Sequence, residues 1–175
     1  GDMDISIIDE LPPGRSPSQT RWLRPDQREQ ANRFIRKEVA AGHQAFVVCP
    51  LIDESDSLQT SAAVEEHRKL SEDVFSALNV GLLHGRMNLK EKTAVMERFR
   101  SGEINVLVST PVVEVGVDIP NATVMMVEGA DRFGLSSLHQ LRGRVGRSDS
   151  QGYCILVAEN PSEDAQARLS VMEQE

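Results

Sequence analysis

The sequence is poor in aromatic residues and has no long apolar run. Aromatic side chains make up 4% of the 175 residues, with one Trp and one Tyr. A stacking platform for single-stranded bases needs several exposed rings, so we do not expect one to be the main feature. The longest apolar stretches, such as residues 45–49 and 106–108, are far too short to cross a bilayer. Because no charged and then apolar signal segment opens the chain, we expect a cytoplasmic protein without a membrane partner.

Cysteine is also scarce, and histidine is scattered. Cys49 and Cys154 each lie inside an apolar run, which predicts buried free thiols in strands. The four histidines, at positions 43, 67, 84 and 139, do not have the short spacing of metal ligands. The sequence therefore predicts no metal site.

The charge balance is acidic overall but uneven along the chain. Lys and Arg total 19 against 27 Asp and Glu, which gives a net charge of −8. This balance argues against a free-standing nucleic-acid binder, because such proteins usually carry a basic face. Residues 132–147, however, contain four arginines and no acidic residue, whereas residues 159–175 hold five acids and one arginine. The sequence thus still allows a local basic site on an acidic body.

Strands and helices are predicted to alternate along the chain. Prolines and serines within residues 5–19 indicate an extended connector, and residues 1–3 are set aside as a remnant of expression. Strands that are apolar throughout are typical of a parallel sheet covered by helices on both faces, so an α/β fold is expected. The predicted strands are 20–23, 46–49, 80–83, 104–108, 123–127 and 153–158, and the predicted helices lie between them at 26–41, 58–77, 89–100 and 135–145.

Two of these helices carry recognisable start signals. Asp26 follows a proline and precedes Glu29 by three residues, which predicts an acidic version of the capping box. Asn88 predicts the N-cap of a second helix. The apolar side of that second helix is predicted to comprise Leu89, Val95, Met96 and Phe99.

The strongest chemical signal is the run 140–147, Gln-Leu-Arg-Gly-Arg-Val-Gly-Arg. On a continuous helix Gln140, Arg144 and Arg147 would share one face, while Arg142 would point elsewhere. Glycine is unfavourable inside a helix, so two of them suggest a backbone that approaches another group closely. Guanidinium groups on such a face suit a polyphosphate. The alternative, a solvated basic helix end, explains the arginines but not the glycines or the missing acids.

A second motif spans residues 106–120, where a strand runs into Thr110 and Pro111. This pair is typical of an N-cap followed by proline at the first helical position. Ligands of open parallel sheets bind beyond the carboxyl ends of strands, where Thr110 could give its hydroxyl and N–H to a phosphate. Gly116 permits an unusual backbone angle, and Asp118 could accept from a sugar hydroxyl. The alternative is a tight turn with a capping threonine and an exposed aspartate.

A third motif follows the strand at 80–83. Gly85 and the amino end of the helix capped by Asn88 could hold a phosphate of a nucleic-acid strand, with Arg86 adding positive charge. His84 is interpreted as a hydrogen-bonded turn residue, and His139 as a structural or relay residue.

An apparent metal motif at residues 53–54, Asp-Glu after an apolar run, is rejected. The 175 residues contain no G-x-x-x-x-G-K-[ST] phosphate loop for such a pair to serve. Pro50 would also interrupt the strand before Asp53. Residues 53–56 are therefore predicted to form a solvated acidic loop.

These motifs, in this order, resemble those of the second RecA-like lobe of superfamily 2 helicases. Residues 47–52, 109–121 and 140–147 are similar to motifs IV, V and VI of that superfamily. The resemblance is greatest to the RecG group, through residues 8–15, 49–52, 82–87 and 132–140. Transcription-repair coupling factors share the Phe-Gly-Leu run at 133–135, but the Pro-Pro-Gly-Arg connector favours RecG. DEAD-box proteins fit less well, because they usually have His where Gln140 stands.

This resemblance, which covers about residues 5–168, implies a RecA-like three-layer domain of a monomeric, ATP- and Mg²⁺-dependent motor. Such motors unwind branched DNA, including stalled forks and Holliday junctions. The first lobe, which carries the phosphate loop and the Mg²⁺ ligands, and the wedge domain would be partners in the same polypeptide. Residues 1–19 would be a connector, 20–160 the lobe, and 161–175 the start of a truncated helical segment. A non-catalytic binding module with the same fold is the alternative, which the intact Gln-Arg-Arg pattern disfavours.

The resemblance also implies roles for individual residues. The residues that would contact ATP and stabilise charge on its γ-phosphate are Gln140, Arg144 and Arg147. The nucleotide pocket would be completed by Gly116 and Asp118. The residues that would lie along the DNA strand are Ser109, Thr110, Gly85 and Arg86.

Overall fold

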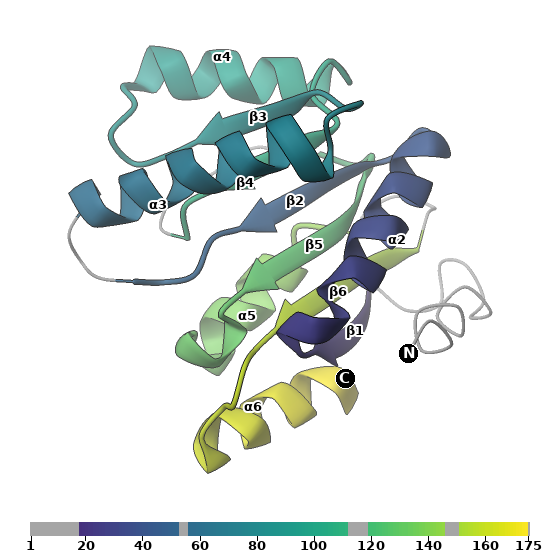
Figure 1. Cartoon of the computed structure of the whole chain (residues 1–175), viewed down its shortest axis with the longest axis vertical. Coiled ribbons are helices and arrows are strands. Elements are labelled where there is room, and N and C mark those ends of the chain that lie inside the picture. Colours follow the sequence, from purple (N-terminus) through teal and green to yellow (C-terminus); the bar gives the residue numbers. More distant parts are fainter. Residues whose placement is uncertain (1–17, 53–55, 112–118, 146–150, 175) are drawn as a thin grey trace.

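The chain forms one six-stranded parallel sheet (Figure 1). The computed structural model describes residues 18–52, 56–111, 119–145 and 151–174. The strand order is β1-β6-β5-β2-β4-β3, and every neighbouring pair is parallel, as the apolar strands predicted. No helix in these ranges is long and apolar enough to span a membrane. The strands are β1 Ser18–Leu23, β2 Gln44–Val48, β3 Val80–Leu83, β4 Val106–Ser109, β5 Ala122–Glu128 and β6 Gly152–Val157.

Helices cover both faces of the sheet, which confirms the predicted three layers (Figure 1). Alternate residues of each strand point to opposite faces, so β2 sends Phe46 and Val48 into one core and Ala45 and Val47 into the other. One face packs against α2 (Arg28–Ala40) and α3 (Asp56–Lys69), and α3 continues into the π-helical turn η2 (Leu70–Val74). The other face packs against α4 (Leu89–Arg100), α5 (Leu135–Arg142) and α6 (Glu163–Gln174).

The start of α4 follows the prediction. The Asn88 side chain accepts from the Glu91 N–H at 2.8 Å, and the Glu91 carboxylate accepts from the Asn88 N–H at 2.9 Å. Met96 and Phe99 are buried, as expected, but Leu89 is 80% exposed. Placing Leu89 on the apolar side was wrong, because the first residue of the helix projects beyond the sheet.

The start of α2 differs from the prediction. A 3-10 turn, η1 (Pro25–Gln27), precedes α2, so the α-helix begins at Arg28 and Asp26 is not its N-cap. The Gln27 side chain instead accepts from the Arg24 N–H at 2.9 Å. Proline has no backbone N–H that would need a hydrogen-bond partner at the start of a helix. The 3-10 turn can therefore begin at Pro25, one residue before the predicted N-cap Asp26.

Both cysteines are free and buried, as predicted. Burial raises the pKa of the Cys49 thiol far above its usual range and that of Cys154 to about 12. Because the thiolate is the nucleophile and the metal ligand, both groups are chemically inert at neutral pH.

The last helix belongs to the same core as the sheet. Leu169 and Met172 of α6 are buried, and the Glu173 carboxylate accepts from the backbone N–H of Trp22 in the edge strand β1 at 2.8 Å. The Arg168 guanidinium donates to the carbonyls of Asp131 and Phe133 at 2.9 and 3.2 Å, next to the short 3-10 turn η3 (Ala130–Arg132). Glu173 of α6 thus satisfies a backbone N–H on the free edge of β1, where another strand could otherwise pair.

Candidate functional sites at the two rims of the sheet

The parallel strands create two rims, one at their carboxyl ends and one at their amino ends. At the carboxyl-end rim, β3 and β4 finish side by side, with Leu83 opposite Ser109. The Thr110 N–H donates to the Leu83 carbonyl at 3.1 Å. The second and third sequence motifs are therefore joined here by a bond between residues 27 positions apart in the chain, Leu83 and Thr110.

The backbone N–H of Thr110 is not available to a phosphate, as the sequence had suggested it would be. Its N–H is used by Leu83, so the expectation that this group would meet a phosphate is wrong. Its hydroxyl is buried and has no hydrogen-bond partner among the described residues. The neighbouring Ser109 hydroxyl donates to the Thr110 carbonyl at 2.9 Å. Of the polar groups of Thr110, only the hydroxyl lacks a partner among the described residues. It is therefore the group of Thr110 that is left for a ligand.

The loop after β3 presents Gly85 and an exposed Arg86 at the same rim. The Arg86 guanidinium donates to the Ser57 hydroxyl at 2.7 Å, which links this loop to α3. The Arg86 backbone N–H donates to His84 Nδ1 at 3.2 Å, so His84 is the hydrogen-bonded turn residue that was predicted. Burial lowers the pKa of His84, which keeps its imidazole neutral at pH 7 with Nδ1 as an acceptor.

The arginine motif lies at the opposite, amino-end rim. Val145 accepts at its carbonyl from the Ser18 hydroxyl at 3.5 Å, and Ser18 is the first residue of β1, opposite the first residue of β6, Gly152. Arg144, which precedes Val145, is half-buried at this rim. Arg147 lies outside the described residues.

The geometry of this motif corrects one prediction. α5 ends at Arg142, and Gly143 is its C-cap. The Arg144 N–H then bonds to the Leu141 carbonyl at 3.1 Å, three residues back, as in a 3-10 turn. Gln140 is exposed on the helix, but Arg144 has left it, so the two do not share a helical face.

After Thr110 and Pro111, the chain is next described at Ile119. Residues 112–118, with Gly116 and Asp118, lie outside the described residues. The chain is described again from Ile119, which is buried and whose carbonyl accepts from Ala122, the first residue of β5, at 2.9 Å. Because β5 pairs directly with β6, Ile119 enters at the same rim as Arg144. Thr110 and Ile119, the described residues on either side of this segment, therefore lie at opposite rims of the sheet.

Comparison with known proteins shows the family to which the chain belongs. The helicase conserved C-terminal domain matches residues 27–149. The chain belongs to this family.

Relatives of this helicase domain are similar over nearly its whole length. The ATP-dependent DNA helicase RecG of Synechocystis sp. is 54% identical over 99% of the chain, and that of Bacillus subtilis is 48% identical over 98%. The chain spans only 21% and 25% of those two proteins. A solved structure of RecG bound to a three-way DNA junction matches 94% of the chain with a TM-score of 0.77 and 45% identity, and the chain covers 21% of it. The C-terminal domain of S. cerevisiae Dbp5, at 17% identity and a TM-score of 0.60 over 90% of the chain and 84% of that domain, shows the shared fold alone.

Arg142 of the helicase domain is hydrogen-bonded to two neighbouring elements of the fold. Its guanidinium donates to the Thr20 hydroxyl at 3.3 Å and to the Met172 carbonyl at 3.2 Å, and it contacts His139 Nδ1 at 3.1 Å. Arg142 thus ties α5 to the edge strand β1 and to α6.

Sequence reasoning missed a partly buried ion cluster at the carboxyl-end rim. Arg28 forms ion pairs with Glu66, at 2.8 Å, and with Glu128, the last residue of β5. Burial raises the pKa of Glu128 to about 8, helped by a hydrogen bond with Glu66. Burial opposes ionisation of Glu66 too, but its hydrogen bonds with Glu128 and Arg28 lower its pKa. The two carboxyl groups therefore share one proton at neutral pH.

The cluster forms part of the wall of a cavity of about 320 Å³. Asp131, Arg132 and Glu159 also line this cavity, so its charges nearly cancel. One signal could have found it: Glu128 follows a four-residue apolar run and precedes a glycine, where a lone carboxylate needs a buried partner. The described residues contain no group of three or more His, Cys, Asp or Glu side chains that could hold a metal ion.

Proposed function

We propose that this domain is the second motor lobe of a RecG-type, ATP-dependent DNA helicase that remodels branched DNA. The observation that carries the proposal is the 45–54% identity to RecG proteins over 94–99% of the chain. A relative with this similarity has been solved on a three-way DNA junction. A transcription-repair coupling translocase is less well supported, because the relatives matched over the whole chain are RecG proteins.

At the amino-end rim we assign Gln140, Arg144 and Arg147 to ATP. A planar guanidinium can bind phosphoryl oxygens through two parallel hydrogen bonds and stabilise the charge that develops during transfer. The half-buried Arg144, in a stretch of chain without acidic residues, fits a phosphate group. Gly116 and Asp118 would complete the nucleotide pocket from the neighbouring segment. The Mg²⁺ that accompanies ATP would be held by the first lobe.

At the carboxyl-end rim we assign Ser109, Thr110, Gly85 and Arg86 to the DNA strand. The support is their side-by-side placement and the exposed Arg86 guanidinium. The segment 109–121 begins at this rim and ends at the nucleotide rim, so it is the covalent connection between the two sites.

The wider context is proposed on the same basis. We assign residues 20–160 to the lobe, residues 1–19 to a connector, and residues 161–175 to the beginning of a further helical segment whose first helix, α6, packs into the core of the lobe. A first lobe and a wedge domain would belong to the same monomeric polypeptide, here called the parent protein. Two free buried thiols agree with the reducing cytoplasm expected for a DNA motor.

The test uses the parent protein with a synthetic three-way junction. We expect ATPase activity that rises with added junction DNA, and strand separation that needs both ATP and Mg²⁺. A parent protein that binds junctions equally well with and without nucleotide, and that hydrolyses no ATP, would be a binding module instead.

A polypeptide of these 175 residues alone should show no measurable ATPase. The reason is that the chain contains no phosphate loop, so positioning and most electrostatic stabilisation of the phosphates are missing. Phosphate release would be measured with and without forked DNA, and a DNA-stimulated rate above the buffer background would contradict the assignment.

The same polypeptide should bind DNA weakly. A net charge of −8 repels phosphate, and the proposed DNA contacts form only a short strip. We expect a Kd of about 10⁻⁴ M or weaker at physiological salt, which is the range of non-specific binding. Fluorescence anisotropy with duplex and three-way junction DNA measures this. Tight, junction-selective binding would mean that a recognition element lies within this lobe.

A further inference from the structure

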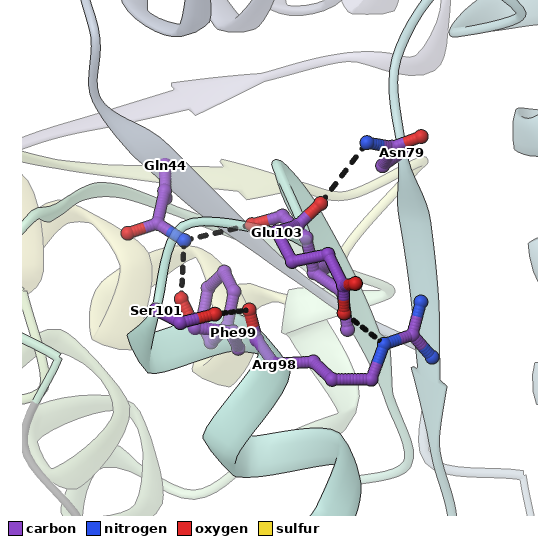
Figure 2. Close-up of polar contacts among 7 residues, drawn as sticks. Gln44, Asn79, Arg98, Phe99, Ser101 and Glu103 are labelled. Atoms are coloured by element: carbon purple, nitrogen blue, oxygen red, sulfur yellow. Dashed lines mark hydrogen bonds and ion pairs between the residues drawn. The ribbon is translucent and has the colours of Figure 1, made fainter.

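Two kinds of exposed arginine occur in the part of the chain that the structure describes. On α3 and α4, exposed arginines are paired with nearby glutamates, as Arg98 is with Glu103 (Figure 2). Arg86 and Arg132 are also exposed, but neither forms an ion pair with a described residue. Arg86 follows the carboxyl end of β3, and Arg132 follows that of β5. The carboxyl-end rim therefore carries two arginines whose charge is not matched by a described carboxylate.

The guanidinium of Arg132 contacts the chain just beyond the central strand β2. It donates to the Leu51 carbonyl at 3.1 Å. Because β2 lies between β5 and β4, this bond directs the side chain from β5 toward the strand ends that carry Ser109, Thr110 and Arg86. The bond uses one of several N–H donors of the guanidinium, so the others remain for an anion.

The turn that carries Arg132 is held in place by its neighbours. The Arg168 guanidinium of α6 donates to the carbonyls on either side of Arg132, at 2.9 and 3.2 Å. Gly129 precedes this turn with a φ of +61°, and a Cβ at this position would lie 2.9 Å from the Cβ of Pro50. Arg132 therefore projects from a close-packed part of the fold, and its backbone needs little ordering when it binds a ligand.

The spacing of the two arginines suits a DNA backbone. The ends of β3 and β2 are separated by β4, so they are two strand spacings apart, about 10 Å. One strand of duplex DNA carries a phosphate about every 3.4 Å along the axis, so contacts at this separation would reach phosphates about three nucleotides apart. Asp131 and Glu159 line the cavity beside Arg132, where β6 ends. Their charge would repel a phosphate, so we place the end of the strand at Arg132.

We propose that Arg132 binds a phosphate of the DNA strand and extends its path from Arg86 across the end of β2. This inference rests on the proposed function, because it adds a residue to the proposed DNA site. A guanidinium that already has one bond to a main-chain carbonyl can still donate two hydrogen bonds to phosphate oxygens. Since the contact is with the backbone, it positions the strand without reading its sequence.

The experiment measures the Kd of the nucleotide-free parent protein for a synthetic three-way junction at several salt concentrations. Each phosphate contact releases counterions, so its loss should lower the slope of log Kd against log salt by about 0.7–0.9. We expect this change for Arg132→Ala, together with binding that is about five-fold weaker at physiological salt. Arg132→Lys should keep the wild-type slope, because lysine retains the charge.

Two further variants give the reference and the control. Arg86→Ala should lower the slope by the same amount as Arg132→Ala, because Arg86 is the phosphate contact already proposed. Arg98→Ala is the matched control, since it removes an exposed arginine from the opposite rim that is already paired with Glu103. This variant should keep the slope and the Kd of the wild type.

The salt dependence separates a phosphate contact from a structural role. If Arg132→Ala weakened binding equally at every salt concentration, Arg132 would only fasten Leu51, and the inference would be wrong. A wild-type slope in Arg132→Ala beside a lowered slope in Arg86→Ala would also overturn it, while leaving the proposed DNA rim intact. A wild-type parent protein that did not bind the junction would refute the proposed function itself.

Discussion

In the parent protein, Arg144→Ala should lower the kcat for DNA-stimulated ATP hydrolysis by about 10³-fold or more and abolish unwinding. Arg144 is half-buried at the amino-end rim, where our proposal places the phosphates. Arg144→Lys should restore little, because a point charge cannot replace a planar donor that binds two oxygens at once. Steady-state ATPase with saturating forked DNA measures both variants. Arg147→Ala is expected to behave like Arg144→Ala, although Arg147 lies outside the described residues.

Arg142→Ala is the internal control for this prediction, and the structure gives it a distinct phenotype. Its guanidinium bonds to Thr20 and to the Met172 carbonyl, so its loss loosens α6 and β1 rather than the nucleotide site. We expect the unfolding free energy to fall by about 1.5–3 kcal/mol, the range for hydrogen bonds from a charged group. The folded fraction should keep near-normal turnover. Normal turnover in the Arg144 variant together with lost turnover in the Arg142 variant would reverse the two assignments.

The sheet could be predicted well because each strand signal is local. Strands of a parallel sheet covered on both faces are apolar along their whole length, and even the edge strand β3 was predicted residue for residue at 80–83. The start of α4 was equally readable, since Asn88 and Glu91 satisfy each other within one turn. The end of α5 was not readable. Whether Arg144 continues the helix or enters a 3-10 turn depends on how Val145 meets the start of β1, which no local pattern shows.

The placement of the candidate sites could be predicted only in part. The sequence placed the turn at Thr110 beyond the carboxyl ends of the strands, but it did not show where the chain after that turn would lead. The structure shows that the chain leaves the carboxyl ends at Thr110 and re-enters at the amino ends at Ile119. The ion cluster was missed for a similar reason, because Arg28 is 100 residues from Glu128 and 38 from Glu66. Both features are set by tertiary contacts between segments that are distant in sequence.

That cluster leads to a prediction on stability and pH. Between about pH 5 and pH 8, Glu128 should make the free energy of unfolding of the 175-residue chain fall as the pH rises. The pKa of Glu128 is raised from its ordinary 4.5 to about 8 in the folded state, chiefly by burial. In this window the folded chain therefore binds more protons than the unfolded chain, so stability is lost as pH rises, by at most about 1.4 kcal/mol per pH unit. Glu66 acts outside the window, because a lowered pKa costs stability only as pH falls below its ordinary value.

Glu128→Gln isolates this effect. Glutamine has the shape of the protonated glutamate but cannot ionise, so it removes the cost of a buried charge that appears as pH rises. The lowered pKa of His84 gives an opposite trend below about pH 6.5, but it is present in every variant and cancels in the comparison. Glu65→Gln is the matched control, since Glu65 lies on the same helix as Glu66 with its side chain exposed and paired to Arg68.

Urea unfolding at pH 5, 6, 7 and 8 gives the free energies. The Glu128→Gln variant should gain stability over wild type as pH rises, by a few kcal/mol at pH 8, while Glu65→Gln should follow the wild-type curve. If Glu128→Gln ran parallel to wild type throughout, the two carboxyl groups would not share a proton, and the Arg28 cluster would be an ordinary fully ionised network.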